Sequence, residues 1–536
     1  MRWATGRRQA AGVLFSIAVL SLLGGCGKKD APSSAAAPAA ASAAPANAAA
    51  TFSVLAGSEV RDIEPALLKA AQEAGVTLKL SYAGTLDIVE RINAGESFDA
   101  ILPASGAYPT LALAAKPLAR EKLFYSRVAL GVKAAKLKAL GWDRQVPTWA
   151  EIAAAAGRGA LRYAMTNPAS SNSGMSAVFA VASAVAGKTE DLSAQEVDAK
   201  VLTAFLSGQK LTAGSSGWLA DAFAKAPEGL DAMVNYEAVI LRTNARLAEA
   251  DRLTLVYPQD GVISADYPLM LLVEARRVDY GKLVAAFKAQ AFQRDAAAAG
   301  FLRPALSGVA LAPGLPDTAA VELSFPNRLE VIDAVLGAYQ SQWRRPATSI
   351  FVLDVSGSMM GDRLEAMRAA LKVLAGAEAS TASARYARFQ SRERVVLITF
   401  SDRVDAPVEV DFTPAALQAA RDRVLGYADA LQAKGGTGIY AALLSADALA
   451  KRERERDADR FVSVVLLTDG ENTNGPDLAE FRKRTAGGVS ARVFPIMFGE
   501  ASSADMQALA DATGGRLFDG RKSSLALVFK EIRGYQ

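Results

Sequence analysis

The chain has 536 residues, of which 51% are hydrophobic, and its formal net charge is +4. This length is enough for two to four domains with sizeable cores, and the small net charge gives no sign of a nucleic-acid partner. The sequence contains no histidine, which excludes Ser-His-Asp triads, histidine zinc sites and histidine general bases. We therefore expect a binding protein and not an enzyme.

Residues 1–25 are predicted to be a lipoprotein signal peptide. Three arginines among the first eight residues precede a short apolar run, residues 12–23, and this run is too short for a membrane-spanning helix of about 20 residues. The motif LGGC, which ends at Cys26, resembles the lipobox of bacterial lipoproteins. The resemblance implies cleavage before Cys26 and its lipidation, with a lone buried thiol or an uncleaved anchor as the alternatives.

Lipidation of Cys26 would place the protein in the cell envelope, on the periplasmic face of a membrane or on the extracellular surface. The residue after the cysteine is Gly27, which by the habit of lipoproteins favours the outer membrane. Residues 31–50 are Ala, Pro and Ser with one Asn and no charge. Such a segment cannot pack a core, and we predict that residues 26–50 form a lipidated tether.

Residues 51–316 are predicted to be an α/β domain because strand-like and helix-like segments alternate along them. This alternation is typical of a mostly parallel sheet with helices on both faces. The expected strands are 52–55, 76–83 and 98–102, and the expected helices are 65–74 and 86–94.

Four segments of this region resemble the type II periplasmic solute-binding proteins. The resemblance implies two lobes that close on a ligand, one formed by residues 52–130 plus 246–316 and the other by residues 131–245. The chain would then cross between the lobes near Leu130 and Leu241. The segments are the first strand with Gly57-Ser58, FDAIL at 98–102 with Ser105, NPASSNSGMSAVFA at 167–180, and GFLRP at 300–304.

A Ser-rich loop at residues 170–174 leads into a predicted helix. The N-terminus of a helix carries unsatisfied N–H groups and a partial positive charge, which favours anions. We expect a small solute or oxyanion here, although capping of the helix explains the serines equally well. Tyr236 and Tyr267 are candidate cleft walls, although a tyrosine buried in the core is the more common case. The candidate ligand-binding residues are Ser58, Ser105, Ser171, Ser173, Gly174 and Tyr236.

Residues 317–345 follow a Pro- and Gly-containing hinge at 313–316. Leu329, Ile332 and Leu336 recur at helical spacing, which predicts a helix that connects the two domains.

Residues 346–536 are predicted to be a second α/β domain with a doubly wound, Rossmann-like sheet. The uninterrupted apolar runs at 350–353 and 464–467 are typical of strands buried on both faces. Further strands are expected at 395–400, 492–498 and 516–518, and helices at 363–374, 415–425 and 439–450.

Oxygen-bearing side chains follow the two apolar runs of this domain. Asp354, Ser356 and Ser358 come directly after the first run, and Asp469 follows the second. Thr437 lies in the Gly-rich turn GGTG that precedes the last predicted helix. Oxygens at i, i+2 and i+4 of a turn can converge on a hard cation such as Mg²⁺, which binds oxygen ligands in an octahedron. Helix capping by the aspartates is the alternative.

This pattern resembles the metal-ion-dependent adhesion site (MIDAS) of von Willebrand factor type A (VWA) domains. The resemblance implies that Asp354, Ser356, Ser358, Thr437 and Asp469 bind Mg²⁺, or else Mn²⁺ or Ca²⁺. It also implies an open coordination position for an Asp or Glu carboxylate of a protein partner.

These features predict an envelope-anchored binding protein that binds a protein partner through its metal site and a small solute through its N-terminal region. The alternative is the solute-binding component of an ABC-type uptake system, with the C-terminal domain as a docking accessory. The charge run KRERERDAD at 451–459 is predicted to be a solvated helix end, with a docking surface as the other interpretation.

Overall fold

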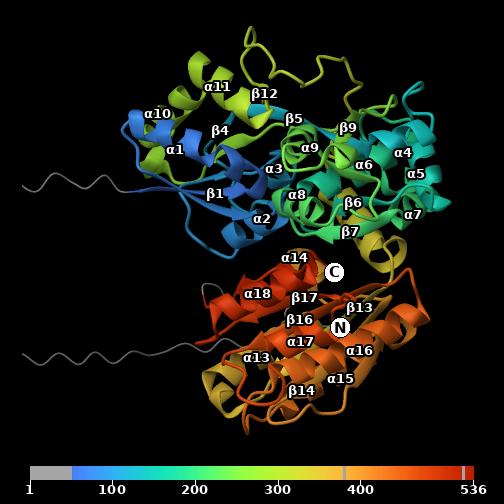
Figure 1. Ribbon diagram of the computed structural model, residues 1–536. Helices are drawn as coiled ribbons and strands as arrows, with labels where there is room; N and C mark the ends of the chain where they lie inside the picture. Colours follow the sequence, from blue (N-terminus) through green and yellow to red (C-terminus); the bar gives the residue numbers. More distant parts are fainter. Residues whose placement is uncertain (1–50, 378–381, 522–524, 536) are drawn as a thin grey trace, which may run out of the picture. The chain divides into compact units, whose positions relative to one another are not determined.

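The computed structural model describes residues 51–377, 382–521 and 525–535 (Figure 1). The predicted signal peptide, Cys26 and the tether lie outside the described residues and remain predictions. Within the described part of the chain, no helix is both long and apolar enough to cross a membrane.

The first lobe is built on a five-stranded sheet in the order β2-β1-β3-β11-β4. β1 pairs in parallel with β2 and β3, whereas β11 runs antiparallel to β3 and β4. The predicted alternation of strands and helices is confirmed here. The elements are β1 (Phe52–Gly57), η1 (Ser58–Ile63), α1 (Glu64–Glu73), β2 (Leu78–Ala83), α2 (Thr85–Asn93), β3 (Ala100–Leu102), α3 (Ala107–Ala112), β4 (Ala119–Lys122), β11 (Pro268–Leu271), α10 (Arg277–Phe287) and α11 (Gln290–Gly300).

The second lobe is built on a sheet in the order β10-β5-β8-β6-β7, and β9 and β12 also pair with β5. Its long strand β5 is antiparallel to β8 and β9. The elements are β5 (Phe124–Lys133), α4 (Ala134–Ala139), α5 (Trp149–Gly157), β6 (Tyr163–Thr166), α6 (Asn172–Val185), α7 (Ala199–Ser207), β7 (Gln209–Ala213), α8 (Ser216–Lys225), β8 (Ala232–Tyr236), α9 (Glu237–Asn244), β9 (Leu253–Val256), β10 (Ser264–Ala265) and β12 (Arg303–Pro304).

The predicted crossing points between the lobes, near Leu130 and Leu241, are wrong. The chain crosses near Leu123, between β4 and β5, and returns near Tyr267, between β10 and β11. Leu130 lies inside β5 and pairs with both β8 and β9, so it belongs wholly to the second lobe. Tyr267 has a φ angle of +34°, and this left-handed backbone turns the chain from one sheet into the other.

A helix links the second lobe to the C-terminal domain, as predicted, but it is shorter than expected. α12 (Leu329–Ala338) continues into a π-helical turn, η5 (Tyr339–Trp343). Ile332 and Leu336 are fully buried in the core of the N-terminal region. The apolar spacing therefore correctly identified the buried face of this helix.

The C-terminal domain has a six-stranded sheet in the order β15-β14-β13-β16-β17-β18, which confirms the predicted α/β fold class. Its strands are parallel except β15, which is antiparallel to β14. The elements are β13 (Ala347–Asp354), η6 (Gly357–Met359), α13 (Asp362–Ala375), α14 (Ala382–Ala387), β14 (Glu393–Phe400), β15 (Val408–Phe412), α15 (Leu417–Ala430), α16 (Ile439–Arg456), β16 (Phe461–Thr468), α17 (Leu478–Arg484), β17 (Arg492–Met497), α18 (Ser503–Thr513), β18 (Phe518–Asp519) and α19 (Leu525–Arg533).

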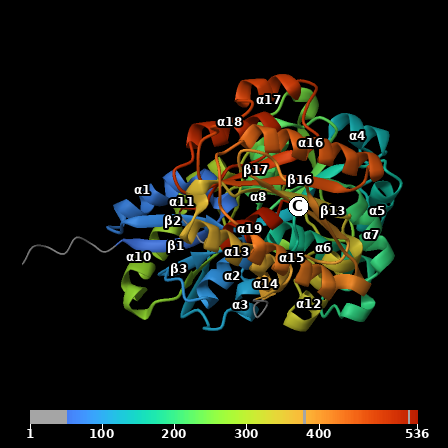
Figure 2. The same ribbon diagram turned by 90° about the horizontal axis from the view of Figure 1, so that it is seen from below.

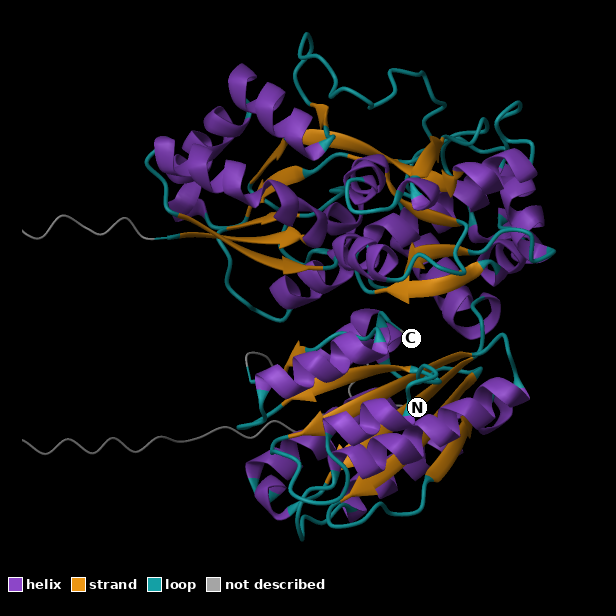
Figure 3. Ribbon diagram, viewed as in Figure 1, coloured by secondary structure: helices purple, strands orange, loops and turns teal. Residues whose placement is uncertain are grey.

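Helices cover both faces of this sheet (Figures 2 and 3). Alternate residues of each strand point to opposite faces, so Phe351 and Leu353 pack with α13, α15 and α19, whereas Ile350 and Val352 pack with α16, α17 and α18. Because both faces are buried, the run Ile350 to Leu353 of β13 is apolar and does not alternate with polar residues. The carboxyl ends of the parallel strands remain as the edge where loops can form a site.

Candidate functional site

The proposed metal ligands lie at the carboxyl edge of the C-terminal sheet. β13 is buried along its whole length and ends at Asp354, which has no exposed surface. Its neighbour β16 runs parallel and in register, with Leu353 paired to Leu467. The loops that follow the two strands therefore start side by side, and this register brings Asp354 and Asp469 to the same place.

Hydrogen bonds fix the carboxylate of Asp354. The backbone N–H of Ser356 donates to Oδ1 at 2.8 Å, and the hydroxyl of Thr468 donates to Oδ2 at 2.6 Å. Thr468 is the last residue of β16. The side chain of Asp354 is thus held by its own loop and by the neighbouring strand.

The three predicted hydroxyl ligands converge on these carboxylates. The hydroxyls of Ser356 and Ser358 are 3.0 Å apart, and Ser358 donates to Asp469 Oδ1 at 2.8 Å. Thr437 comes from the Gly-rich turn before α16. Its hydroxyl and that of Ser358 lie 3.9 and 3.8 Å from the point where a Cβ on Gly470 would stand. The structure thus brings together oxygens from three loops that are far apart in sequence.

The electrostatics of this cluster favour a bound cation. Burial raises the pKa of Asp354, and the nearby charge of Asp469 adds to this rise, while hydrogen bonds from Ser356 and Thr468 oppose it. Asp469 is itself 1% exposed. Two buried carboxylates repel each other, and a positive charge between them relieves both the repulsion and the cost of burial.

Sequence reasoning missed one cation beside the site, Arg363. Its guanidinium donates to Asp469 Oδ2 and lies 3.5 Å from the carbonyl oxygen of Ser358. Arg363 is the second residue of α13, only five positions after Ser358. The sequence could have indicated this contact, because a basic residue lies so close to the Asp-x-Ser-x-Ser motif.

The donor set fits a hard divalent cation. Two carboxylates and three hydroxyls offer only oxygen atoms, which Mg²⁺ and related cations prefer. Among the described residues, no group of three or more His, Cys, Asp or Glu side chains could hold a metal ion. The fit therefore depends on the hydroxyls, and the exposure of Ser358 opens the cluster to solvent.

The predicted solute site is placed where the two lobes meet, but its hydroxyls are bonded to one another. Ser58 of the first lobe donates to Ser215 of the second at 2.8 Å. Ser173 lies 2.8 Å from the hydroxyls of both Thr166 and Ser216. The buried bond between Ser58 and Ser215 joins the two lobes, whereas Thr166, Ser173 and Ser216 all belong to the second lobe.

The remaining serines and Gly174 of the predicted set differ in their roles. Ser171 precedes α6 and its hydroxyl is 3.5 Å from that of Ser173, whereas Ser105 accepts a hydrogen bond from the backbone of Ala107 at 3.3 Å. A Cβ on Gly174 would lie 2.3 Å from the carbonyl oxygen of Thr166. Gly174 is therefore required for close packing of α6 on β6.

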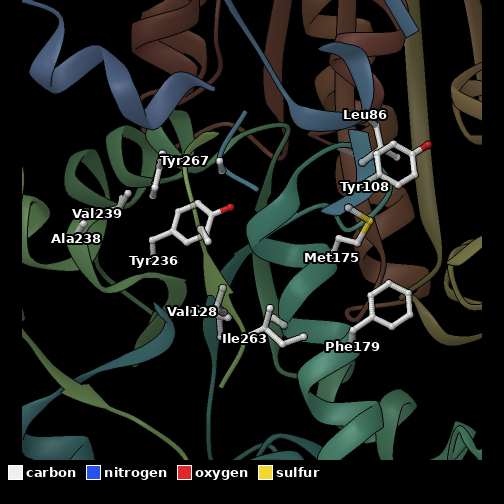
Figure 4. Packing of buried hydrophobic residues seen from close by; sticks show 14 of the residues in the cluster. Leu86, Tyr108, Val128, Met175, Phe179, Tyr236, Ala238, Val239, Ile263 and Tyr267 are labelled. Atoms are coloured by element: carbon white, nitrogen blue, oxygen red, sulfur yellow. The ribbon is translucent and has the colours of Figure 1, made fainter. Parts of the chain in front are cut away.

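Tyr236 and Tyr267 are buried in the core between the lobes (Figure 4). Their ring centroids are 6.1 Å apart at an interplanar angle of 62°. The hydroxyl of Tyr236 accepts a hydrogen bond from Asn172 Nδ2 at 2.9 Å. Neither ring is exposed enough to act as an open cleft wall in this arrangement.

Three buried polar atoms around Tyr236 lack a hydrogen-bond partner among the described residues: Glu59 Oε1, Asn172 Oδ1 and the hydroxyl of Tyr267. Glu59 is 6% exposed. Burial raises its pKa to about 7, and the nearby Arg242 only partly offsets this effect. Unpaired buried polar atoms are costly, so this group indicates a place for a polar ligand. Glu59 follows Gly57-Ser58 directly, and that position was the signal in the sequence.

Comparison with known proteins identifies both parts of the chain. Residues 52–303 match the family described as bacterial extracellular solute-binding protein, and residues 349–471 match the von Willebrand factor type A domain. The predicted order of a solute-binding region followed by a VWA domain is confirmed. Neither matched family is a catalytic one.

Individual relatives match only parts of the chain. An uncharacterized protein of Mycobacterium tuberculosis is 35% identical over 142 residues, which are 26% of this chain and 20% of that protein. Inter-alpha-trypsin inhibitor heavy chain H4 of Sus scrofa is 30% identical over 192 residues, 34% of this chain and 19% of that protein. The chain thus spans about a fifth of the length of these relatives.

Among solved structures, the periplasmic binding protein AfuA from Actinobacillus pleuropneumoniae is similar to part of this chain. It has 12% sequence identity and a TM-score of 0.40, and the match covers 54% of this chain and 97% of that chain.

Proposed function

We propose that this chain, a solute-binding region followed by a VWA domain, is an envelope-anchored binding protein whose VWA domain holds a protein partner through a divalent cation. The observation that supports the proposal is the convergence of Asp354, Ser356, Ser358, Thr437 and Asp469 at one exposed edge of the sheet. The periplasmic or envelope location agrees with the solute-binding family that residues 52–303 match.

The five residues would supply two kinds of ligand to the ion. Asp354 and Asp469 supply two negative charges, which balance a divalent cation, and the three hydroxyls supply neutral oxygens. Five oxygens leave one position of an octahedron open. An Asp or Glu carboxylate of a partner suits that position, because it adds a negative charge next to the ion. We propose Mg²⁺, with Mn²⁺ or Ca²⁺ as alternatives.

Attachment to the membrane is proposed to occur through Cys26. Its LGGC motif and the charge-free tether that follows it would hold the folded part away from the bilayer. Because neither matched family is catalytic, we propose that the chain binds and does not catalyse.

Pulldown from a solubilised envelope fraction tests this function. The wild-type chain should retain a partner in Mg²⁺ and lose it in EDTA. Asp354→Ala and Asp469→Ala should abolish the divalent-dependent capture. Asp422→Ala, which removes an exposed carboxylate from α15, serves as the matched control. Capture that is unchanged in EDTA would contradict the proposal.

A second candidate function, solute binding within an ABC-type uptake system, is favoured by the unpartnered atoms of Glu59, Asn172 and Tyr267. A buried carboxyl group opposes an oxyanion. For this reason we propose a cationic or hydroxylated neutral solute in place of the expected oxyanion.

Calorimetry on the whole chain can test the solute site with a panel of amines, amino acids, sugars and oxyanions. Binding of an amine or sugar that is lost in Glu59→Gln would support the site. The absence of heat with every solute, or preferential binding of oxyanions, would contradict it.

A further inference from the structure

A cavity lined by cationic side chains lies at the end of the VWA sheet opposite to the metal cluster, where β16 and β17 begin. Its volume is about 410 Å³, within the roughly 300–1,000 Å³ range of small-molecule sites. Its walls come from the starts of these two strands, the end of α16, the segment before β13, and β7 of the solute-binding region. Five cationic side chains line it: Lys210, Arg345, Arg454, Arg460 and Arg492.

The acidic groups near the cavity do not balance these charges. Asp459 pairs with Lys210 at 3.0 Å and with Arg345 at 3.2 Å, and Asp457 is 3.5 Å from Arg460. Both aspartates stand outside the lining of the cavity. Five positive charges therefore face only two negative ones, and Asp459 is 77% exposed to solvent.

Two of the arginines have no partner within the described part of the chain. The side chains of Arg454 and Arg492 make no hydrogen bond and no ion pair there. Burial lowers the pKa of Arg492 to about 10, and the like charge of Arg454 contributes to this shift. Arg492 nevertheless remains protonated at neutral pH, so the fold keeps its half-buried charge close to the like charge of the exposed Arg454.

Further donors of this cluster are also unused. The Nε atoms of Arg345 and Arg460 are buried without a hydrogen-bond partner among the described residues. The guanidinium of Arg345 lies over the ring of Phe461, 4.6 Å from its centroid. Phe461 and Tyr535 also line the cavity and give it an apolar wall beside the charges.

We propose that this cavity binds a small polyphosphate, either inorganic or carried by a nucleoside. Four of its five cations are arginines, whose planar guanidinium groups bind phosphate oxygens through paired hydrogen bonds. A ligand with several negative charges would satisfy Arg454 and Arg492 together. It would also contact β7 and the VWA sheet at once, and so stabilise their contact. This proposal does not depend on the metal site.

Binding of inorganic triphosphate to the full chain provides the test, measured by calorimetry in EDTA so that the proposed metal site stays empty. Binding with a rise in melting temperature is expected. Arg492→Gln and Arg454→Gln should each raise the Kd about tenfold, because each removes a charged hydrogen-bond donor. ATP binding tighter than triphosphate would support a nucleoside ligand, and weaker binding would support an inorganic one.

Two controls make the result specific to the cavity. Arg456→Gln removes the same charge from the same helix, but Arg456 does not line the cavity, so triphosphate binding should be unchanged. Citrate, a small anion without phosphate groups, should bind more weakly than triphosphate. No binding of triphosphate, an equal loss in Arg456→Gln, or equally tight binding of citrate would overturn the proposal.

Discussion

The metal site of the VWA domain and the contact between the two lobes are built from the same kind of residue but use it differently. In both places serines follow strands of an α/β sheet. At the metal site, Ser358 donates to the carboxylate of Asp469. Between the lobes, Ser58 bonds to Ser215, which is also a hydroxyl. The two places differ in what the serine hydroxyl bonds to, because the buried Glu59 next to Ser58 leaves its Oε1 without a hydrogen-bond partner among the described residues.

This difference explains why one cluster suits an ion and the other holds the lobes together. Hydroxyls next to Asp354 and Asp469 lie where a cation is attracted, and Ser358 is exposed to solvent. The hydroxyls of Ser58 and Ser173 are buried, and each is hydrogen-bonded to another hydroxyl, that of Ser215 and that of Ser216 respectively. We infer that a Ser-rich loop indicates an ion site only when its hydroxyls are hydrogen-bonded to carboxylates, as Ser358 is to Asp469.

The difference between the two clusters can be tested most directly at Asp354. Asp354→Asn keeps the shape of the side chain but removes one of two negative charges, so Mn²⁺ affinity should fall by roughly a hundredfold, about 3 kcal/mol. Calorimetric titration with Mn²⁺ measures this change. Asp422→Asn should bind Mn²⁺ like the wild type. Equal affinity of Asp354→Asn and the wild type would show that this carboxylate is not a ligand.

Four residues of the metal cluster were predictable from the sequence because they directly follow strands that are easy to recognise, whereas Thr437 lies in a Gly-rich turn and was assigned through the resemblance to VWA domains. Asp354 and Asp469 come one and two residues after apolar runs, and parallel strands place their carboxyl ends together. The position of each aspartate directly after its strand, together with the alignment of the parallel strands, was sufficient to predict that the two carboxylates meet. No knowledge of distant contacts was needed.

The contacts between the lobes were not predictable in this way. Ser58 bonds to a residue 157 positions away, and no local pattern specifies such a partner. The charge run at 451–459 shows the same limit. Most of this run is exposed, as predicted, but Glu453 is 2% exposed and accepts a hydrogen bond from Thr348 at 2.9 Å. Long-range packing decided both cases.

The buried carboxyl group of Glu59, in the solute-binding region, provides a second test of the difference between the two clusters. The pKa of Glu59 rises from 4.5 to about 7 on folding, so the folded state binds more protons than the unfolded state between these values. The stabilisation is complete below pH 4.5 and is lost as the pH rises through about 7, by about 3 kcal/mol. The charge of Arg242 opposes this rise in the pKa of Glu59, and the charge of Asp62 adds to it.

Glu59→Gln should flatten this pH dependence, as measured by urea denaturation at pH 4.5, 6 and 8. The variant should gain stability relative to the wild type as the pH rises. Glu73→Gln, an exposed position on α1, should keep the wild-type profile. Parallel profiles for Glu59→Gln and the wild type would show that this carboxyl is not desolvated in solution.

The contact between the lobes should depend on Arg242 more than on its neighbour Arg246. Arg242 in α9 donates to Asp62 at 2.7 Å and to the carbonyl oxygens of Glu59 and Gly300, all in the first lobe. Arg242→Ala should lower the free energy of unfolding by about 2 kcal/mol, because it leaves buried acceptors unpaired. Urea denaturation measures the change.

Arg246→Ala is the matched control for this interaction. Arg246 pairs with Asp221 at 2.7 Å, but both side chains are exposed and both belong to the second lobe. Exposed pairs contribute about 0–1 kcal/mol. Equal losses in the two variants would contradict a role for Arg242 in holding the lobes together.

The smallest expected effect concerns Arg363, which neutralises Asp469 when no ion is bound. A cation at this place competes with a metal ion for the same carboxylate and repels it. Arg363→Gln should therefore raise Mn²⁺ affinity about fivefold, roughly 1 kcal/mol, and the gain should shrink as salt screens the charges. Arg368→Gln removes a charge from the same helix without touching the site. If Arg363→Gln instead lowers Mn²⁺ affinity, the guanidinium orients Asp469 for the ion and does not compete with it.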